Sequence, residues 1–286
     1  MGNIWEIDFY SRPIFDADNK KLWEVLLCES PLQPQQNLSE LFRYSKFCNN
    51  QQVNSAWLKE AMIEAIAQAP QPPQKIRFFR FAMANMITKA CEELGIAAQP
   101  SRRTFLLKNW LDDRATNFYP RQPGYQLSPA PTSIQNPPSN PQRLPDALIG
   151  QSWAFVNLTL RELGEMPEWD IEFGEALPLN LVALPPDTPV PGILIFSPRA
   201  TPLAAWMSGL DLAALRFVEK PQPQLLLETG ANDSWILVNL RDGQILKEAQ
   251  QFAIAKQKAG QLHFLGVQSS PEAQSFAGFW ILQEVM

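Results

Sequence analysis

Residues 75–121 read KIRFFRFAMANMITKACEELGIAAQPSRRTFLLKNWLDDRATNFYPR, and the spacing of their apolar residues changes along the stretch. KIRFFRF alternates its side chains between two faces, as a strand does, and IAAQP is again extended. Between them, MANMITKACEELG has apolar residues at helical spacing and ends at Gly95, a natural C-cap. FLLKNWLDDRATNFY predicts a second helix, capped by Ser101 or Thr104. Strand, helix, strand and helix together indicate a mixed α+β domain.

The same stretch is basic in an acidic chain. It has nine basic and four acidic residues, a net charge of +5, whereas the rest of the chain has 15 basic and 25 acidic residues, a net charge of −10. Aromatic residues are interleaved with its cations. Cations that follow phosphates, with rings that stack on bases, are typical of a single-stranded nucleic-acid surface. The alternative interpretation is that the rings form a core and the arginines a solvated helix face.

Arg102 and Arg103 lie at the predicted start of the second helix. Backbone N–H groups and two guanidinium groups converge there, which favours a bound phosphate. The other interpretation, which stays equally open, is a surface network of ion pairs with Glu92, Glu93 or Asp112.

The length of 286 residues predicts two domains. We expect an N-terminal α+β domain over residues 1–120, a linker rich in proline over 121–145 and a C-terminal α+β domain over 146–286. A hydrophobic content of 45% excludes a disordered chain, and no apolar run reaches the about 18 residues of a membrane helix. The start MGNIWEIDFY resembles no targeting signal, so a cytoplasmic protein is expected.

Other elements are predicted from local patterns. WEIDFY and LWEVLLCE predict a β-hairpin, followed by a loop over residues 30–40 and a helix over 55–68. The second half predicts these elements in order: strands in QSWAFVNLTL and at residues 192–196, a helix at roughly 201–215, the hairpin QLLLETGANDSWILVNL, a helix over 246–259 and the strand QLHFLGVQ. Hairpin, helix and strand thus occur in both halves, which indicates two related units. The apolar tail SFAGFWILQEV must be buried in a sheet or offered to a partner.

No residue set indicates a reaction. Three cysteines without a CxxC spacing and the single His263 leave little for zinc sites or His-dependent triads. Asp8 and Glu24 in the first hairpin resemble the carboxylates of a restriction-endonuclease-like core, but the lysine of such magnesium-dependent sites is missing. The acidic stretch EMPEWDIEFGEA lacks the spacing of a calcium loop and predicts a solvated surface. We therefore expect no enzyme activity, no metal and no cofactor.

Several motifs, in the right order, cover nearly the whole chain and resemble the Tab-two/Atab-two RNA-binding family of oxygenic phototrophs. They are WEIDFYSRPIFDADNKKLWEVLLCE, FCNNQQVNSAWLKEAM, KIRFFRFAMANMITKACEELGI with PSRRTFLLKNWL, LPDALIGQSWAFV, GILIFSPRATPLAAWMSGL, LLLETGANDSWIL and GFWILQE. The resemblance implies RNA binding without catalysis, in the translation of photosystem mRNA, notably that of a photosystem I reaction-centre subunit. The lack of a visible transit peptide predicts a cyanobacterial source, with thylakoid membranes as an additional location.

The resemblance also implies site residues. The family's aromatic carboxy-terminal tripeptide falls on Trp280, Ile281 and Leu282, with isoleucine where leucine is expected, and its SRR motif falls on residues 101–103. Phosphate contacts are expected from these side chains: Arg77, Arg80, Arg102, Arg103 and Lys108. Stacking is expected from Trp280 with Phe79 or Phe118.

Single-stranded RNA, in particular the leader of a photosystem mRNA, is thus the expected partner. The alternative is a photosystem assembly factor that binds protein through its acidic face and apolar tail, and a dimer through that tail is left open.

Overall fold

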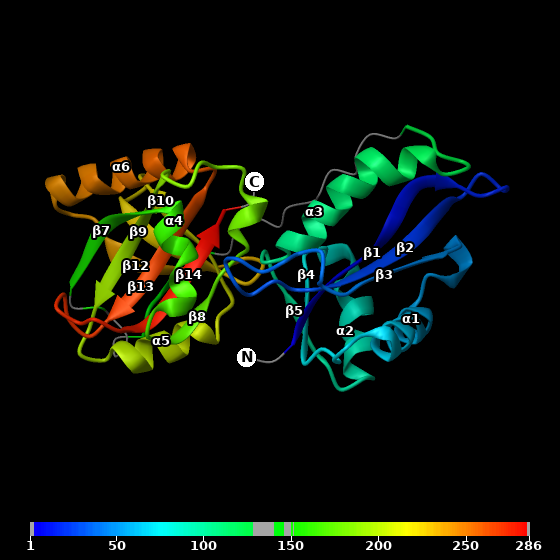
Figure 1. The fold of residues 1–286 in the computed structure, drawn as a ribbon, viewed down its shortest axis with the longest axis horizontal. Coiled ribbons are helices and arrows are strands. Elements are labelled where there is room, and N and C mark those ends of the chain that lie inside the picture. Colours follow the sequence, from blue (N-terminus) through cyan, green and yellow to red (C-terminus); the bar gives the residue numbers. More distant parts are fainter. Residues whose placement is uncertain (1–2, 128–139, 146–149, 151, 285–286) are drawn as a thin grey trace. The chain divides into compact units, whose positions relative to one another are not determined.

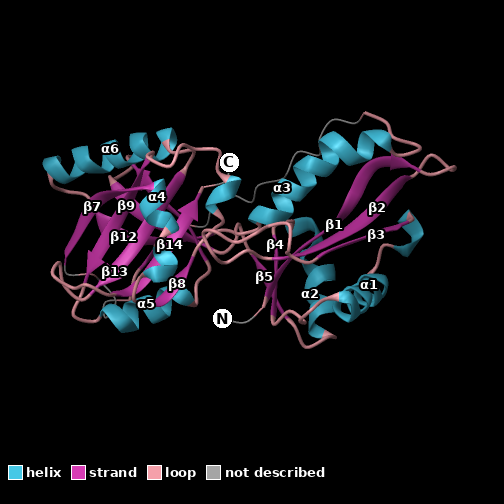
Figure 2. Ribbon diagram, in the orientation of Figure 1, coloured by secondary structure: helices cyan, strands magenta, loops and turns pink. Residues whose placement is uncertain are grey.

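The computed structural model describes residues 3–127, 140–145, 150 and 152–284, and the chain forms two compact units (Figure 1). The first unit comprises Met1–Pro31 and Asn37–Asn136, and the second comprises Leu32–Gln36 and Pro137–Met286. Each unit combines helices with a mixed sheet, so the predicted α+β class is confirmed (Figure 2). No helix among the described residues is long and apolar enough to span a membrane.

The first unit has one five-stranded sheet, in the order β3-β2-β1-β4-β5. Its strands are β1 (Ile4–Phe15), β2 (Lys21–Glu29), β3 (Arg43–Cys48), β4 (Lys75–Phe78) and β5 (Ala97–Pro100). Only β2 runs against the others, because β1 and β3 are antiparallel to it while β4 and β5 are parallel to β1. The sheet is therefore mixed, and its strand order does not by itself identify a restriction-endonuclease-like core. A fold of this kind does not by itself determine a function.

Helices cover both faces of this sheet. The predicted hairpin β1–β2 and the helix α1 (Ser55–Gln68) are confirmed, and the N-cap of α1 is Asn54, whose side chain accepts a hydrogen bond from the Trp57 N–H at 2.9 Å. Val25 and Leu27 of β2 pack with α1 and α2 (Ala84–Glu92), whereas Leu26 and Cys28 pack with α3 (Phe105–Asp113). Alternate residues of β2 therefore contact helices on opposite faces of the sheet. Figure 1 shows α3 on one side of the sheet and α1 and α2 on the other.

Short helical turns complete the first unit. α2 ends at Glu92 with Glu93 as its C-cap, rather than at the predicted Gly95, which follows in the next turn with a left-handed φ of 70°. The chain continues from α3 into a π-helical turn, which is less common than an α-helical one and often occurs at functional sites. These turns are 3₁₀ at Asn50–Gln52, Phe81–Met83 and Tyr119–Arg121, and π-helical at Arg114–Phe118.

The second unit has two sheets. The five-stranded sheet has the order β7-β9-β13-β14-β8, and the four-stranded sheet the order β10-β11-β12-β6. The strands are β6 (Gln142–Arg143), β7 (Ser152–Thr159), β8 (Ile171–Glu175), β9 (Pro189–Phe196), β10 (Leu212–Val218), β11 (Gln224–Thr229), β12 (Asp233–Asn239), β13 (Leu262–Gln268) and β14 (Phe276–Gln283). The helices are α4 (Leu160–Gly164), α5 (Ala200–Ser208) and α6 (Gly243–Lys258), with 3₁₀ turns at Met166–Glu168 and Leu179–Leu181. One core contains Leu203 of α5, Phe252 of α6, Leu215 of β10 and Trp280 of β14.

Two sequence predictions for the second unit need correction. The helix expected over residues 201–215 ends at Ser208, because Asp211 adopts a left-handed φ of 56° and residues 212–218 pair with β11. The two halves also differ in topology. After α6 the chain enters β13 in the other sheet, whereas after α1 it enters β4 in the sheet of its own hairpin. The shared order of elements therefore does not reflect a shared arrangement of strands.

Parts of the segment expected to be a linker take part in both units. The Phe15 N–H donates to the Gly124 carbonyl at 2.9 Å, and the Gln126 N–H donates to Pro13 at 3.1 Å. At the other end, β6 pairs with β12. Residues 128–139 of the predicted linker lie outside the described residues.

A short part of the loop predicted at residues 30–40 belongs to the second unit. The Leu179 N–H donates to the Pro34 carbonyl at 2.9 Å, and the Gln35 side-chain amide donates to the Gly164 carbonyl at 2.9 Å. The second unit is therefore assembled from two separate parts of the chain.

Replacing Trp280 by alanine should destabilise the second unit, because the indole is 3% exposed and its ring lies directly over Gly278. The lost packing and the cavity predict a loss of about 3–5 kcal/mol in the free energy of unfolding, measured by urea denaturation. Ile254→Ala, on an exposed face of α6, is the control and should change little. Equal effects of the two variants would contradict this assignment of Trp280 to the core.

Candidate nucleic-acid interface

Three carboxylates lie on the face of the first sheet that α3 covers. In the antiparallel register of β1 and β2, Glu6 is opposite Cys28, Asp8 opposite Leu26, and Tyr10 opposite Glu24. Residues two apart on a strand share a face, so Glu6, Asp8 and Glu24 point to the same side. All three side chains are buried, and the cost of burying a charge is large unless it is paired.

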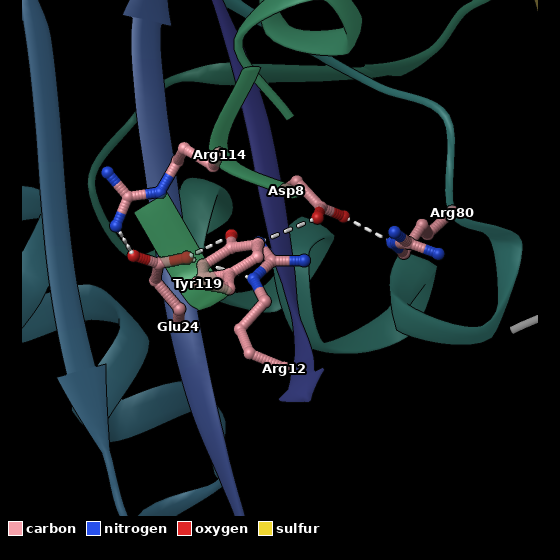
Figure 3. Close-up of polar contacts among 6 residues, drawn as sticks. All are labelled: Asp8, Arg12, Glu24, Arg80, Arg114 and Tyr119. Atoms are coloured by element: carbon pink, nitrogen blue, oxygen red, sulfur yellow. Dashed lines mark hydrogen bonds and ion pairs between the residues drawn. The ribbon is translucent and has the colours of Figure 1, made fainter. Parts of the chain in front are cut away.

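Arginines supply that pairing in a network of six residues, all buried except the partly exposed Arg80: Asp8, Arg12, Glu24, Arg80, Arg114 and Tyr119 (Figure 3). Arg12 Nε donates to Glu24 Oε2 at 2.9 Å, and Arg12 Nη2 forms an ion pair with Asp8 Oδ2 at 2.9 Å. Arg114 pairs with Glu24 Oε1, and the Tyr119 hydroxyl donates to Glu24 Oε2 at 2.6 Å. Glu24 thus joins the hairpin to the helical segment after α3.

Burial and nearby carboxylates act in opposite directions on the pKa of Arg12. Burial alone lowers the pKa of Arg12, but the neighbouring Asp8 and Glu24 carboxylates outweigh it and leave that pKa raised. Burial raises the pKa of the Tyr119 phenol, so it stays protonated and serves as a donor. At physiological pH Arg12 therefore stays charged and Tyr119 stays a donor.

Asp8 and Glu24 are the two carboxylates that the nuclease hypothesis required, and in this structure both are partners of arginine. The described residues contain no group of three or more His, Cys, Asp or Glu side chains that could hold a metal. The arrangement supplies buried ion pairs, whose role is to position the elements that carry them.

Glu6 fixes the start of α3. Its carboxylate accepts a hydrogen bond from the Leu107 N–H at 2.8 Å and another from the Ser30 hydroxyl at 2.8 Å. Thr104 is at the N-cap position, as predicted, but its side chain makes no capping hydrogen bond. Burial raises the pKa of Glu6 to about 7, even though the hydrogen bond from Leu107 lowers it. A residue 101 positions earlier in the chain therefore performs the capping that local sequence assigned to Ser101 or Thr104.

Cations and rings gather where β4 ends and α3 begins. We call Tyr10, Phe79, Arg80 and Lys108 the Arg80 cluster. The Arg80 guanidinium carbon lies 4.1 Å from the centre of the Tyr10 ring and 4.9 Å from that of Phe79, and Lys108 Nζ lies 5.5 Å from the Phe79 ring. Asp8 Oδ1 accepts from Arg80 Nε at 2.5 Å. All four residues of the cluster are partly exposed, so the structure presents fixed cations beside aromatic faces.

Of the predicted contacts, Phe79, Arg80 and Lys108 are brought together in this cluster. Arg102 is partly exposed and lies close enough to Lys108 for its charge to help burial lower the pKa of Lys108. Phe118 is partly exposed, with the Arg114 guanidinium 3.9 Å from the centre of its ring.

The other predicted contacts are buried. Arg77 and Arg103 are each 1% exposed, and Trp280, Ile281 and Leu282 lie inside β14. Side chains in these positions have almost no surface on which a base or phosphate can rest. Their contact with RNA stays a prediction, and the proposal below does not use it.

Sequence reasoning did not find Tyr10, Arg12, Glu24 and Arg114 as partners of the site. The alternation of side chains along the two strands of the hairpin could have predicted part of the site. Once the register is known, it places Asp8, Tyr10 and Glu24 on one face. Arg114 reaches Glu24 because of the path that the chain takes after α3, and no local sequence pattern predicts that path.

Comparisons with known proteins cover nearly the whole chain. A family model described as RNA-binding protein Tab2/Atab2 N terminal matches residues 4–114, and one described as RNA-binding protein Tab2/Atab2, C-terminal domain matches residues 131–283. A protein of Arabidopsis thaliana, "Protein TAB2 homolog, chloroplastic", is 37% identical in an alignment 288 residues long that covers 97% of this chain and 74% of that protein. The protein of the same name from Zea mays is 36% identical over 98% of this chain and 71% of its own length.

Similarity to solved structures is weak. A chain of the simian T-cell lymphotropic virus intasome in complex with PP2A regulatory subunit B56 gamma aligns with a TM-score of 0.29 and 14% identity, over 43% of this chain and 44% of that chain. This alignment supports no conclusion about function.

Glu24→Gln should strongly destabilise the first unit, because it leaves Arg12 and Arg114 buried without their shared carboxylate. Breaking a buried pair in this way costs about 3–5 kcal/mol, which a urea unfolding curve measures. Glu64→Gln removes an exposed carboxylate that pairs with Lys46 and should leave the midpoint nearly unchanged. A Glu24→Gln protein as stable as the Glu64→Gln control would show that the network contributes nothing.

Glu6→Gln should change how stability depends on pH. The pKa of Glu6 rises from 4.5 to about 7 on folding, so between these values the folded state holds a proton that the unfolded state has lost. Wild-type stability should therefore fall by about 3 kcal/mol as pH rises from about 4.5 to 7, and then level off. Glutamine keeps the acceptor oxygen for Leu107 and has no proton to lose. Thermal unfolding of both proteins from pH 5 to 8 tests this, and parallel profiles would refute it.

Proposed function

Because this chain belongs to the Tab2/Atab2 family of RNA-binding proteins, we propose that it binds single-stranded RNA through the Arg80 cluster of its first unit. The observation that supports this most is the fixed geometry of Arg80. Asp8 holds its Nε, while Tyr10 and Phe79 flank the guanidinium. Figure 3 draws a single contact between Asp8 and the guanidinium, through Nε, and the two Nη groups that Asp8 does not hold suit a two-pronged contact with a phosphate.

Lys108 extends the cationic surface from Arg80 along α3. Burial lowers its pKa, but the nearby Glu6 carboxylate opposes that shift. The Arg80 guanidinium and the Lys108 ammonium both contact the Phe79 ring. A partly exposed ring beside two cations suits a base that stacks while its flanking phosphates are neutralised.

The RNA we propose is the leader of a photosystem mRNA, and the consequence of binding is activation of its translation. Support comes from the family resemblance of the motifs, since the two plant relatives are named only as chloroplast proteins. A cyanobacterial source and a location beside thylakoid membranes are parts of the same proposal.

A protein-binding assembly factor remains the competing hypothesis, and one of its two supports has weakened. The apolar tail that was to contact a partner is strand β14, whose residues 279–282 are at most 3% exposed. The acidic charge of the chain still favours it, since strong RNA binders are usually basic.

Lys108→Gln should weaken binding of a labelled single-stranded leader RNA, and Arg80→Gln with Lys108→Gln should weaken it further. Each lost phosphate contact should reduce the slope of log affinity against log salt by about 0.7, or about 1.4 for the double variant. The measurement is fluorescence anisotropy at several salt concentrations, with unfolding curves to verify that each variant is folded.

Lys59→Gln with Lys89→Gln is the matched control, because it removes two cations from α1 and α2 on the opposite face of the sheet. Equal loss in the two double variants would locate binding elsewhere. No binding by the wild type at low salt would refute the proposal and favour the assembly factor, and a scrambled RNA that binds as well as the leader would refute message specificity alone.

A further inference from the structure

Strand β7 lies at one edge of the five-stranded sheet of the second unit (Figure 1). On one side it pairs with β9 along its whole length, from Ser152 to Thr159, without a shift in register. On the other side, the backbone groups of residues 152–158 form no hydrogen bond with any described part of the chain. Thr159 closes this free edge, because its N–H donates to Glu162 Oε2 at 2.6 Å.

The other edge strands of the described sheets each contain a charged residue or a proline. They are β3 with Arg43 and Lys46, β5 with Pro100, β6 with Arg143, β8 with Glu172 and Glu175, and β10 with Arg216. Natural sheets use such residues, and β-bulges, to keep their edges from pairing with another chain. Strand β7 reads SWAFVNLT, with no charge and no proline, and its register with β9 contains no bulge. Its edge therefore lacks the features that protect the other edges.

Both faces of β7 are apolar along this edge. Trp153 and Phe155 share one face, and the centres of their rings lie 5.1 Å apart. Ala154, Val156 and Leu158 alternate with them and share the other face. All five side chains are partly exposed, whereas every residue of β13, in the interior of the same sheet, is buried. A further strand beside β7 would remove this apolar surface from water.

We propose that β7 pairs with β7 of a second copy of this chain, so that the five-stranded sheets of two second units join into one. A two-fold axis perpendicular to the sheet makes the two strands antiparallel and keeps each face of the sheet on its own side. Trp153 and Phe155 then meet the aromatic face of the other copy, and the aliphatic face meets its counterpart. The pairing is independent of RNA binding.

The strand itself favours a second copy as the occupant. An edge shaped for a charged partner carries complementary charge, and β7 has none. Two copies of an uncharged strand bring no like charges together. The apolar tail Phe276–Gln283, the other candidate for a dimer contact, is strand β14, and both of its edges are already paired, with β13 and with β8.

The size of the free edge sets the strength of the expected contact. Seven residues of antiparallel strand span about 24 Å, which makes a small interface. We therefore expect a reversible dimer with a dissociation constant of about 1–100 µM. Each dimer carries two Arg80 clusters and can hold two segments of RNA.

Sedimentation velocity of the full chain without RNA, over about 1–200 µM protein, brackets this strength. The mass should rise from 32.3 kDa toward twice that value. Asn157→Lys, at an exposed position of β7, should raise the dissociation constant at least about tenfold, because lysine protects edges from pairing. Ser45→Lys makes the same change at an exposed position of the edge strand β3 and should dimerise as the wild type does. Urea unfolding curves verify that both variants are folded.

Amide hydrogen exchange of the wild type locates the contact without any substitution. Amides of residues 152–158 should exchange several-fold more slowly at the highest protein concentration than at the lowest, whereas amides of β3 and β8 should exchange alike at both. A monomer at every concentration would overturn the proposal and leave the edge to a strand of a different protein. A dimer that does not slow exchange in β7, or that both lysine variants weaken equally, would place the contact on another surface and overturn it too.

Discussion

The pairing of Glu24 with Arg12 and Arg114 is the interaction on which the first unit depends. It joins β1, β2 and the segment after α3 at a place where an unpaired charge would be costly. The hydrogen bond from Leu107 to Glu6 fixes the other end of α3. With both ends held by carboxylates of the sheet, the side chains that α3 carries, including Lys108 and Trp110, keep defined positions.

An acidic chain can present a cationic surface when its carboxylates lie beneath it. Asp8 is buried and holds Arg80 by its Nε, so the negative charge orients the guanidinium from below. The same carboxylate neutralises part of the positive charge that the arginines bring into the interior. The net charge of the chain is therefore a poor guide to the charge of this surface. The positions of the buried anions and the partly exposed cations are a better guide.

Local patterns were enough to predict the first hairpin and α1 with its Asn54 cap. They failed where the pairing of strands that are distant in the sequence determines the secondary structure. Residues 212–215 read as helix and form β10, because Asp211 turns the chain and β11 offers a partner. For the site, composition located the basic stretch and Arg80 within it, but it treated every arginine as exposed. The burial of Arg77 and Arg103 depends on tertiary structure that a charge count does not contain.

Residues 32–36 lie between β2 and β3 in the sequence and yet are part of the second unit. The two family models divide the chain after residue 114 and before residue 131, which resembles a simple pair of modules. Division of the polypeptide there would deprive the second module of the backbone that Leu179 hydrogen-bonds through Pro34. The two matched segments are therefore not independent modules. A gene fusion that carried the second segment without residues 32–36 would lack part of the second unit.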